Sequence, residues 1–135
     1  MSKARLVAVK ATGASCKGAI LDKSRLSRSD LSQTDFSGVR AHKSNFYQAQ
    51  LVSANFTDAV LDESNFESAK LSHADFSQSN LEKTTFTNAQ LSEADFSRAV
   101  LSKAILDGAD CQNTKFSSAD LSKASFREAE IEEAV

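Results

Sequence analysis

The 135-residue chain contains no proline and no tryptophan, and it has only two cysteines and four glycines. Two cysteines are too few for the disulfide framework of a small secreted domain. No window approaches the roughly 20 consecutive apolar residues of a membrane-spanning helix. The apolar stretch from Leu6 to Val9 is also shorter than the core of a secretory signal. We therefore expect a soluble protein of the cytoplasm.

The dominant feature of the sequence is a strict period of five residues. Every leucine and all nine phenylalanines fall in one phase, counted from Leu6 in steps of five, which we call the central position. Two residues earlier stands a small side chain: 17 of the 27 positions from Ala4 to Ala134 are alanine, and the others are Ser, Thr or Val. All four glycines lie two residues after a central position. Because the phase never slips, residues 1–135 are expected to form a single domain.

A period of five excludes an amphipathic α-helix, since each step turns the helix by roughly 140° and spreads the large side chains around it. In an extended segment, a small and a large residue two positions apart share one face. The chain must then change direction every five residues. Glycine at one fixed place indicates a position that sometimes needs φ > 0, as in a type II turn. Such corners produce a coil, and stacked coils satisfy one another's backbone groups through parallel pairing.

The repeat Ala-(Asp/Asn)-(Leu/Phe)-x-x, seen at Ala74-Asp75-Phe76-Ser77-Gln78, resembles the pentapeptide-repeat family over essentially the whole chain. The resemblance implies an all-β fold, a right-handed quadrilateral parallel β-helix with four repeats per turn. One turn is then 20 residues, which predicts about seven coils and a rod on the order of 30 Å long.

In that geometry, residues 20 apart stack on one another inside the rod. We expect one side to carry a column of phenylalanines and the opposite side to carry a column of leucines. These structural core residues are Phe36, Phe56, Phe76, Phe96, Phe116, Leu61, Leu81, Leu101 and Leu121.

The sequence lacks the patterns of catalytic and cofactor sites. It has no phosphate-binding loop, nucleotide fingerprint or nucleophile elbow. His42 and His73 have no cysteine or second histidine at metal-ligand spacing. Cys16 and Cys111 are expected to be buried thiols about five turns apart, too far for a disulfide. We therefore expect no enzymatic activity, no cofactor and no bound metal.

Charge is unevenly distributed, although the net charge is only −2. Residues 1–43 carry nine basic and three acidic side chains, whereas residues 44–135 carry seven and fifteen. Such charge either protects the ends from edge-to-edge stacking or steers contacts of opposite sign. A row of lysines at 20-residue spacing, interrupted by Glu63, is interpreted as a solvated mixed ladder. Val60 and Val100 point outward on the same face and Tyr47 on another, and these three are the candidate partner contacts.

The features together favour a non-catalytic scaffold that acts through protein–protein interaction, with a partner that the sequence does not identify. An end-to-end homodimer is a further expectation, whereas neither direct nucleic-acid binding nor membrane association is expected. The alternative is DNA mimicry, since some pentapeptide-repeat proteins resemble duplex DNA, bind DNA gyrase and protect it from quinolones. A rod of this length would need on the order of 18 negative charges to match a duplex, which carries about one per 1.7 Å.

Overall fold

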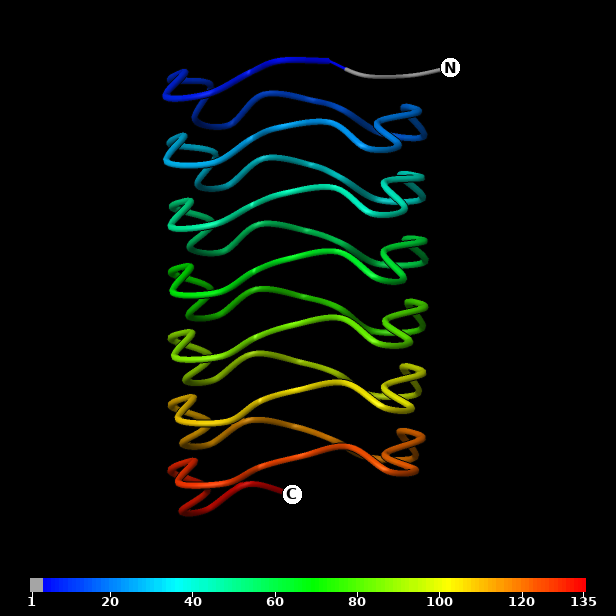
Figure 1. Ribbon diagram of the computed structural model, residues 1–135, viewed down its shortest axis with the longest axis vertical. Coiled ribbons are helices and arrows are strands. Elements are labelled where there is room, and N and C mark those ends of the chain that lie inside the picture. The colour runs from blue at the N-terminus through cyan, green and yellow to red at the C-terminus, as the bar shows by residue number, and fades with distance from the viewer. Residues whose placement is uncertain (1–3) are drawn as a thin grey trace.

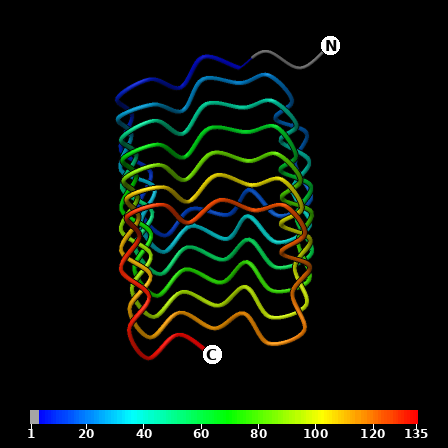
Figure 2. The ribbon, with the colours of Figure 1, turned by 60° about the horizontal axis from the view of Figure 1, so that its bottom comes forward.

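The computed structural model describes residues 4–135, which wind into a straight rod of stacked coils (Figures 1 and 2). Within these residues there is no helix and no strand longer than a single bridged residue. Parallel bridges join residues that are 20 apart, from Arg5↔Arg25 to Asp110↔Glu130. The fold is a right-handed quadrilateral β-helix in which each five-residue repeat forms one side. No helix in the described part of the chain could cross a membrane.

Each corner of the coil is a two-residue turn. The carbonyl of the central residue accepts a hydrogen bond from the amide three residues later, as in Ala59 N to Phe56 O at 3.1 Å. The residue two after the central position has positive φ in every described repeat, from Ala8 to Glu133, with values between 54° and 69°. A positive φ at the second turn residue and not at the first is the pattern of a type II turn. The left-handed conformation expected at some corners is therefore present at all of them, on 22 residues that are not glycine.

Aspartate and asparagine precede many central residues because they brace the corner. In ten repeats the side-chain oxygen accepts a hydrogen bond from the amide two residues later, for example Asp75 Oδ1 from Ser77 N at 2.8 Å and Asn55 Oδ1 from Thr57 N at 2.9 Å. This Asx turn satisfies the amide of the first corner residue, which in these ten repeats finds no backbone acceptor among the described residues. The side chain also shapes the backbone for the turn that follows.

The core consists of columns of like side chains. Phe36, Phe56, Phe76 and Phe96 are completely buried, and successive rings in this column stack with centroids 4.8 to 4.9 Å apart. Phe116 continues the column at 5.4 Å and is partly buried. Such offset stacking adds to the stabilisation from apolar burial.

The expectation that the leucine column lies opposite this phenylalanine column is wrong. Phe36 meets Phe46 edge to face, with ring centroids 6.1 Å apart, and this contact recurs along the rod. Half a turn is ten residues, so two columns of phenylalanine ten residues apart face each other across the interior. The leucine column, namely Leu61, Leu81, Leu101 and Leu121, lies on the adjacent side. The first three of these leucines are fully buried and Leu121 is partly buried.

Several repeats replace the small inward alanine with a hydroxyl residue. Ser44 and Ser64 donate to the carbonyls of Leu21 and Ala41 in the preceding coil, at 2.5 and 2.6 Å. Each serine Oγ also accepts an amide hydrogen bond, from Ser24 N and Ser44 N. No buried side-chain nitrogen or oxygen in residues 4–135 lacks a partner. These hydroxyls therefore join adjacent coils without leaving a polar group unsatisfied.

Candidate interaction face

One side of the rod combines outward apolar residues with charged corners, and we call it the valine face. Its outward middle positions are Ile20, Arg40, Val60, Asn80, Val100 and Asp120, which parallel bridges hold in a single row. Val60 and Val100 are 37% and 40% exposed. Neighbouring coils lie about 4.8 Å apart, so an apolar side chain emerges about every 10 Å along the row. The sequence expectation that both valines share one face agrees with this arrangement.

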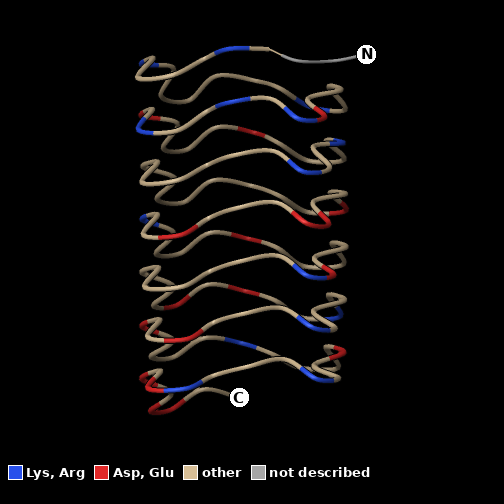
Figure 3. Ribbon diagram, viewed as in Figure 1, with Lys and Arg blue, Asp and Glu red and all other residues tan. Residues whose placement is uncertain are grey.

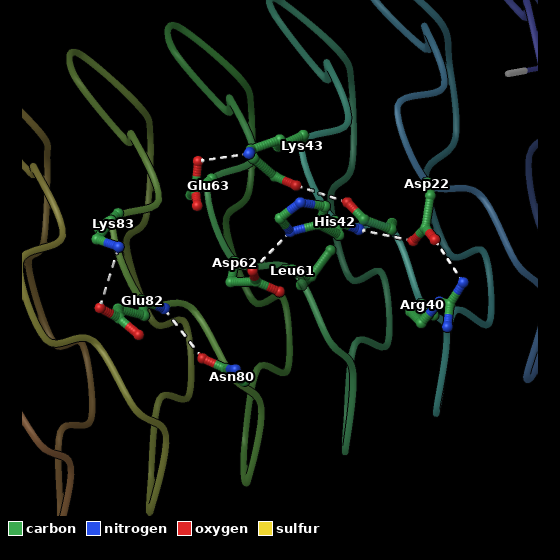
Figure 4. Close-up of polar contacts among 12 residues, drawn as sticks. Asp22, Arg40, His42, Lys43, Leu61, Asp62, Glu63, Asn80, Glu82 and Lys83 are labelled. Atoms are coloured by element: carbon green, nitrogen blue, oxygen red, sulfur yellow. Dashed lines mark hydrogen bonds and ion pairs between the residues drawn. The ribbon is translucent and has the colours of Figure 1, made fainter. Parts of the chain in front are cut away.

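One edge of the valine face, the lysine corner, contains a ladder of ion pairs (Figure 4). The lysine corner comprises residues 22–23, 42–43, 62–63, 82–83, 102–103 and 122–123. His42 Nδ1 lies 2.6 Å from Asp62 Oδ2, and the His42 amide donates to Asp22 Oδ1 at 3.2 Å. The other oxygen of Asp22 lies 2.6 Å from the Arg40 guanidinium. Asp22 therefore holds Arg40 and the His42 backbone together.

Three of the five lysines of this corner form ion pairs with carboxylates. Lys43 Nζ lies 3.1 Å from Glu63, and Lys83 and Lys103 each lie 3.4 Å from Glu82. Hydrogen bonding from Lys103 and the nearby charge of Lys83 hold the pKa of Glu82 below its ordinary value. The row is a mixed ladder rather than a continuous cationic track.

The other edge of the valine face, the serine corner, carries Arg98 and Asp58, neither of which forms an ion pair among residues 4–135. It comprises residues 37–38, 57–58, 77–78, 97–98 and 117–118. Arg98 lies in a shallow hollow that is lined by Ser77, Gln78, Ser97, Arg98, Ser117 and Ser118. Within the described residues, no acidic side chain lies within ion-pair distance of Arg98, and no basic side chain lies within that distance of Asp58.

Sequence comparison assigns the family. A family model described as a pentapeptide repeat region matches residues 60–135, and a second, described as pentapeptide repeats in eight copies, matches residues 1–38 and 24–58. The chain belongs to the pentapeptide-repeat family. No curated protein matches it in sequence.

Solved pentapeptide-repeat structures resemble the chain. A pentapeptide repeat protein from the thylakoid lumen of Arabidopsis thaliana is 28% identical, with a TM-score of 0.49. The match covers 78% of this chain and 66% of that one, slightly less than two thirds of its length. HetL, involved in heterocyst differentiation regulation in the cyanobacterium Nostoc, is 21% identical with a TM-score of 0.42, covering 99% of this chain and 87% of HetL. QnrB1, a plasmid-mediated fluoroquinolone resistance protein, is 17% identical with a TM-score of 0.55, covering 100% of this chain and 85% of QnrB1. The likeness to QnrB1 shows the shared fold.

The third candidate contact of this pentapeptide-repeat protein, Tyr47, lies on a corner beyond the adjacent side of the rod and is half-buried. Its amide donates to Asn45 Oδ1 at 2.8 Å. The structure therefore brings Val60 and Val100 together but separates Tyr47 from them. Sequence reasoning missed Ile105, which is 40% exposed on the side that precedes the Tyr47 corner. Its place immediately before a central leucine is the same signal that identified the two valines.

The histidines and cysteines do not assemble into a site in residues 4–135. His42 and His73 each face one carboxylate, Asp62 and Glu93 respectively, at 2.6 and 3.3 Å. No group of three potential metal ligands occurs among the described residues. Burial, together with the charge of Asp110, raises the pKa of the Cys111 thiol to about 12. A thiol with such a pKa stays protonated at neutral pH and is a poor nucleophile.

Proposed function

We propose that this pentapeptide-repeat protein is a non-catalytic scaffold that binds another protein through the valine face. The observation that carries the proposal is the row of Val60 and Val100, exposed at regular spacing on a flat, hydrogen-bonded side between two charged corners. Apolar centres with polar rims are typical of protein-binding patches. A stacked coil loses little conformational entropy when it binds, because its backbone is already ordered.

The test is affinity capture from the lysate of the source organism, with the tagged full chain as bait. The variant Val60→Ser/Val100→Ser removes the apolar centre of the valine face. The matched control is Ile105→Ser, which removes an equally exposed apolar residue from another side. We expect a protein that the wild type and the control capture and the double variant loses. A partner that all three baits retain equally would contradict the use of this face.

DNA mimicry has less support than the scaffold function. Figure 3 shows basic and acidic residues interspersed along the rod, and the net charge is −2. Carboxylates on the lysine corner are paired with lysines, as at Glu63 and Glu82. A duplex presents a continuous row of unpaired negative charge. A gyrase supercoiling assay distinguishes the two: no effect at micromolar protein supports the scaffold, whereas inhibition or protection from quinolone favours mimicry.

Three further expectations belong to the same proposal. An end-to-end homodimer is a prediction that rests on partly buried Leu121 and Phe126 and on Ile131, which is 56% exposed. Action in the cytoplasm is supported by the two free cysteines, Cys16 and Cys111. We propose that the protein requires no cofactor. Mass measurement in solution tests the homodimer, and cell fractionation tests the cytoplasmic location.

A further inference from the structure

The valine face is complementary to itself when two copies lie antiparallel, and we propose that it pairs two copies of this chain side by side. This inference deepens the proposed function by naming one partner for the face. The two-fold axis lies in the plane of the contact, perpendicular to the rod, and passes beside Asn80 and Gln78. A residue one or two coils above that axis in one copy then meets the residue equally far below it in the other.

Charges on the middle row and the serine corner match in this arrangement. Asp58 lies one coil to one side of Gln78 and Arg98 one coil to the other, so each Arg98 meets the second copy's Asp58. Neither charge has an ion-pair partner within the described part of a single chain. In the middle row, Arg40 and Asp120 lie two coils either side of Asn80 and face each other across the contact. Arg40 keeps Asp22 through one nitrogen, and its other guanidinium donors remain for the second carboxylate.

The apolar residues match about the same axis. Val60 and Val100 lie one coil either side of Asn80, so each Val60 meets the second copy's Val100 and their exposed surfaces are buried together. Asn80 lies on the axis, where its side-chain amide faces its own counterpart. Its Oδ1 accepts from the Glu82 amide at 3.1 Å, and the NH₂ group remains available to donate. Like charges do meet at the lysine corner, where Lys43 lies opposite Lys123 and where Glu82 and Lys83 each face their own counterparts on the axis. Lys43 is already paired with Glu63, and Lys83 with Glu82.

Other ways of packing the same face lose these pairs of opposite charge. In a parallel arrangement, Arg40 would face Arg40 and Asp120 would face Asp120, while Arg98 would meet the lysine corner at Lys103. Moving the antiparallel axis by one coil, to Val60, places Asp58 against Asp58. Moving it by half a coil buries Arg40 against Val100. The two pairs of opposite charge, Arg98 with Asp58 and Arg40 with Asp120, therefore favour one orientation and one register.

The contact is small, so we expect a weak dimer. In this register the coils from Arg40 to Asp120 overlap, and these five coils at about 4.8 Å give a length of about 24 Å. Five residues at about 3.3 Å give a width of up to about 16 Å. Such a face buries about 800 Å² in total, below the roughly 1,200 Å² at which stable specific interfaces begin. We expect the dissociation constant of the dimer to lie in the micromolar range or above.

Sedimentation equilibrium of the purified full chain tests this proposal, at low salt and at concentrations from about 1 µM to several hundred µM. The mass is expected to rise with concentration from 14.6 kDa toward twice that value. Arg98→Asp places two like-charge contacts in the dimer and is expected to weaken it about tenfold or more. The matched control Lys70→Asp makes the same charge change on the opposite side of the rod and leaves association unchanged. The double variant Arg98→Asp/Asp58→Arg exchanges the two charges and restores it.

An oxidised variant, Asn80→Cys, provides a second readout because the residue lies on the two-fold axis. Covalent dimer is expected from Cys16→Ala/Asn80→Cys and not from Cys16→Ala/Lys70→Cys. A mass that stays at one chain over the whole concentration range would overturn the proposal, but it leaves capture of a different protein open. A dimer that is insensitive to Arg98→Asp would also overturn it and would favour association through the ends.

Discussion

A buried phenylalanine at a central position stabilises the core through two kinds of ring contact. Phe66 stacks on Phe46 and Phe86, with centroids 4.6 and 5.2 Å away, and meets Phe56 and Phe76 edge to face at 5.7 Å. It is completely buried. A narrow bore gives neighbouring rings little freedom to move into a vacancy, so the loss of one ring leaves a cavity.

We expect Phe66→Ala to lower the free energy of unfolding by about 3–5 kcal/mol. Phe66→Leu refills most of the space and should cost less than about 1.5 kcal/mol. Denaturant unfolding followed by circular dichroism measures both values. The control is Phe126→Ala, which removes a partly buried ring and should cost less than Phe66→Ala. Equal losses at the two sites would contradict a continuous aromatic core.

The left-handed corner residue imposes a different constraint. None of the corner positions with positive φ, from Ala8 to Glu133, holds Val, Ile or Thr. A branched β-carbon is strongly disfavoured at positive φ. Ser53, with φ of 56°, donates its amide to Ser72 O at 3.0 Å and lies on an exposed corner.

Ser53→Val is therefore expected to destabilise the protein by about 1–2 kcal/mol, and Ser53→Gly to be neutral or slightly stabilising. Thermal unfolding of the two variants beside the wild type checks the sign of each change. Val52→Thr, one residue earlier on the same corner, is the control because its φ is not positive. A Ser53→Val variant as stable as the wild type would show that the corner is not left-handed in solution.

At the scale of one coil, the Asx turns link stability to pH. Hydrogen bonds from the amide and hydroxyl of Ser37 hold the pKa of Asp35 below its ordinary value, and those from Ser32 do the same for Asp30. At Asp95, burial alone would raise the pKa, but hydrogen bonds from Ser97 outweigh it. A carboxyl whose pKa is lower in the folded state stabilises the fold above its unfolded pKa, and that contribution is lost as the pH falls.

The free energy of unfolding is thus expected to stay nearly constant from pH 7 to about 5 and to fall below about pH 4, where unfolded aspartates bind protons. Asp35→Asn should keep the turn, as Asn45 and Asn55 do elsewhere, and reduce the acid dependence. Glu128→Gln, which removes an exposed carboxyl outside any Asx turn, is the control. Urea unfolding over a pH series measures the slopes. An unchanged slope in Asp35→Asn would contradict a stabilising role for that carboxylate.

The sequence predicts the coil well and its cross-section less well. The period of five identifies every inward position, and the four glycines mark the corner, because both follow from local chemistry. The arrangement of whole columns depends on how repeats ten residues apart meet across the interior. Phe36 and Phe46 belong to facing columns for that reason, although the period of five alone does not distinguish the facing column from the adjacent one.

For the candidate face, the sequence likewise predicts the positions of the residues but not all of their contacts. Val60 and Val100 lie 40 residues apart, two turns of 20, so the repeat alone places them in one row. The contacts of the lysine corner depend on side-chain reach as well as register. Glu82 pairs with Lys83 beside it and with Lys103 in the next coil, whereas Arg40 turns back to Asp22. These ion pairs depend on side-chain rotamers and packing, which the five-residue period does not determine.

For the whole molecule, the stacked register has a consequence for function. Every five-residue repeat presents its outward residues at the same three positions, so a partner meets a regular lattice of side chains. On the valine face that lattice carries apolar residues at Val60 and Val100, and charges at Arg40, Arg98, Asp58 and Asp120. Recognition along the length of this rod therefore depends on which residue occupies which coil. A partner that binds one coil out of register would meet unmatched residues in place of complementary ones.

The 20-residue register is the claim on which both proposals depend, and pyrene excimer fluorescence tests it most directly. Both reporter proteins carry Cys16→Ala, and the Cys111 thiol is buried and stays protonated. In Gln50→Cys/Lys70→Cys, the labels stand on bridged residues of adjacent coils, about 4.8 Å apart. In Gln50→Cys/Arg40→Cys, they stand on opposite sides of the rod. At submicromolar protein, the account predicts strong excimer emission from the first pair and monomer emission from the second, and the reverse result would contradict it.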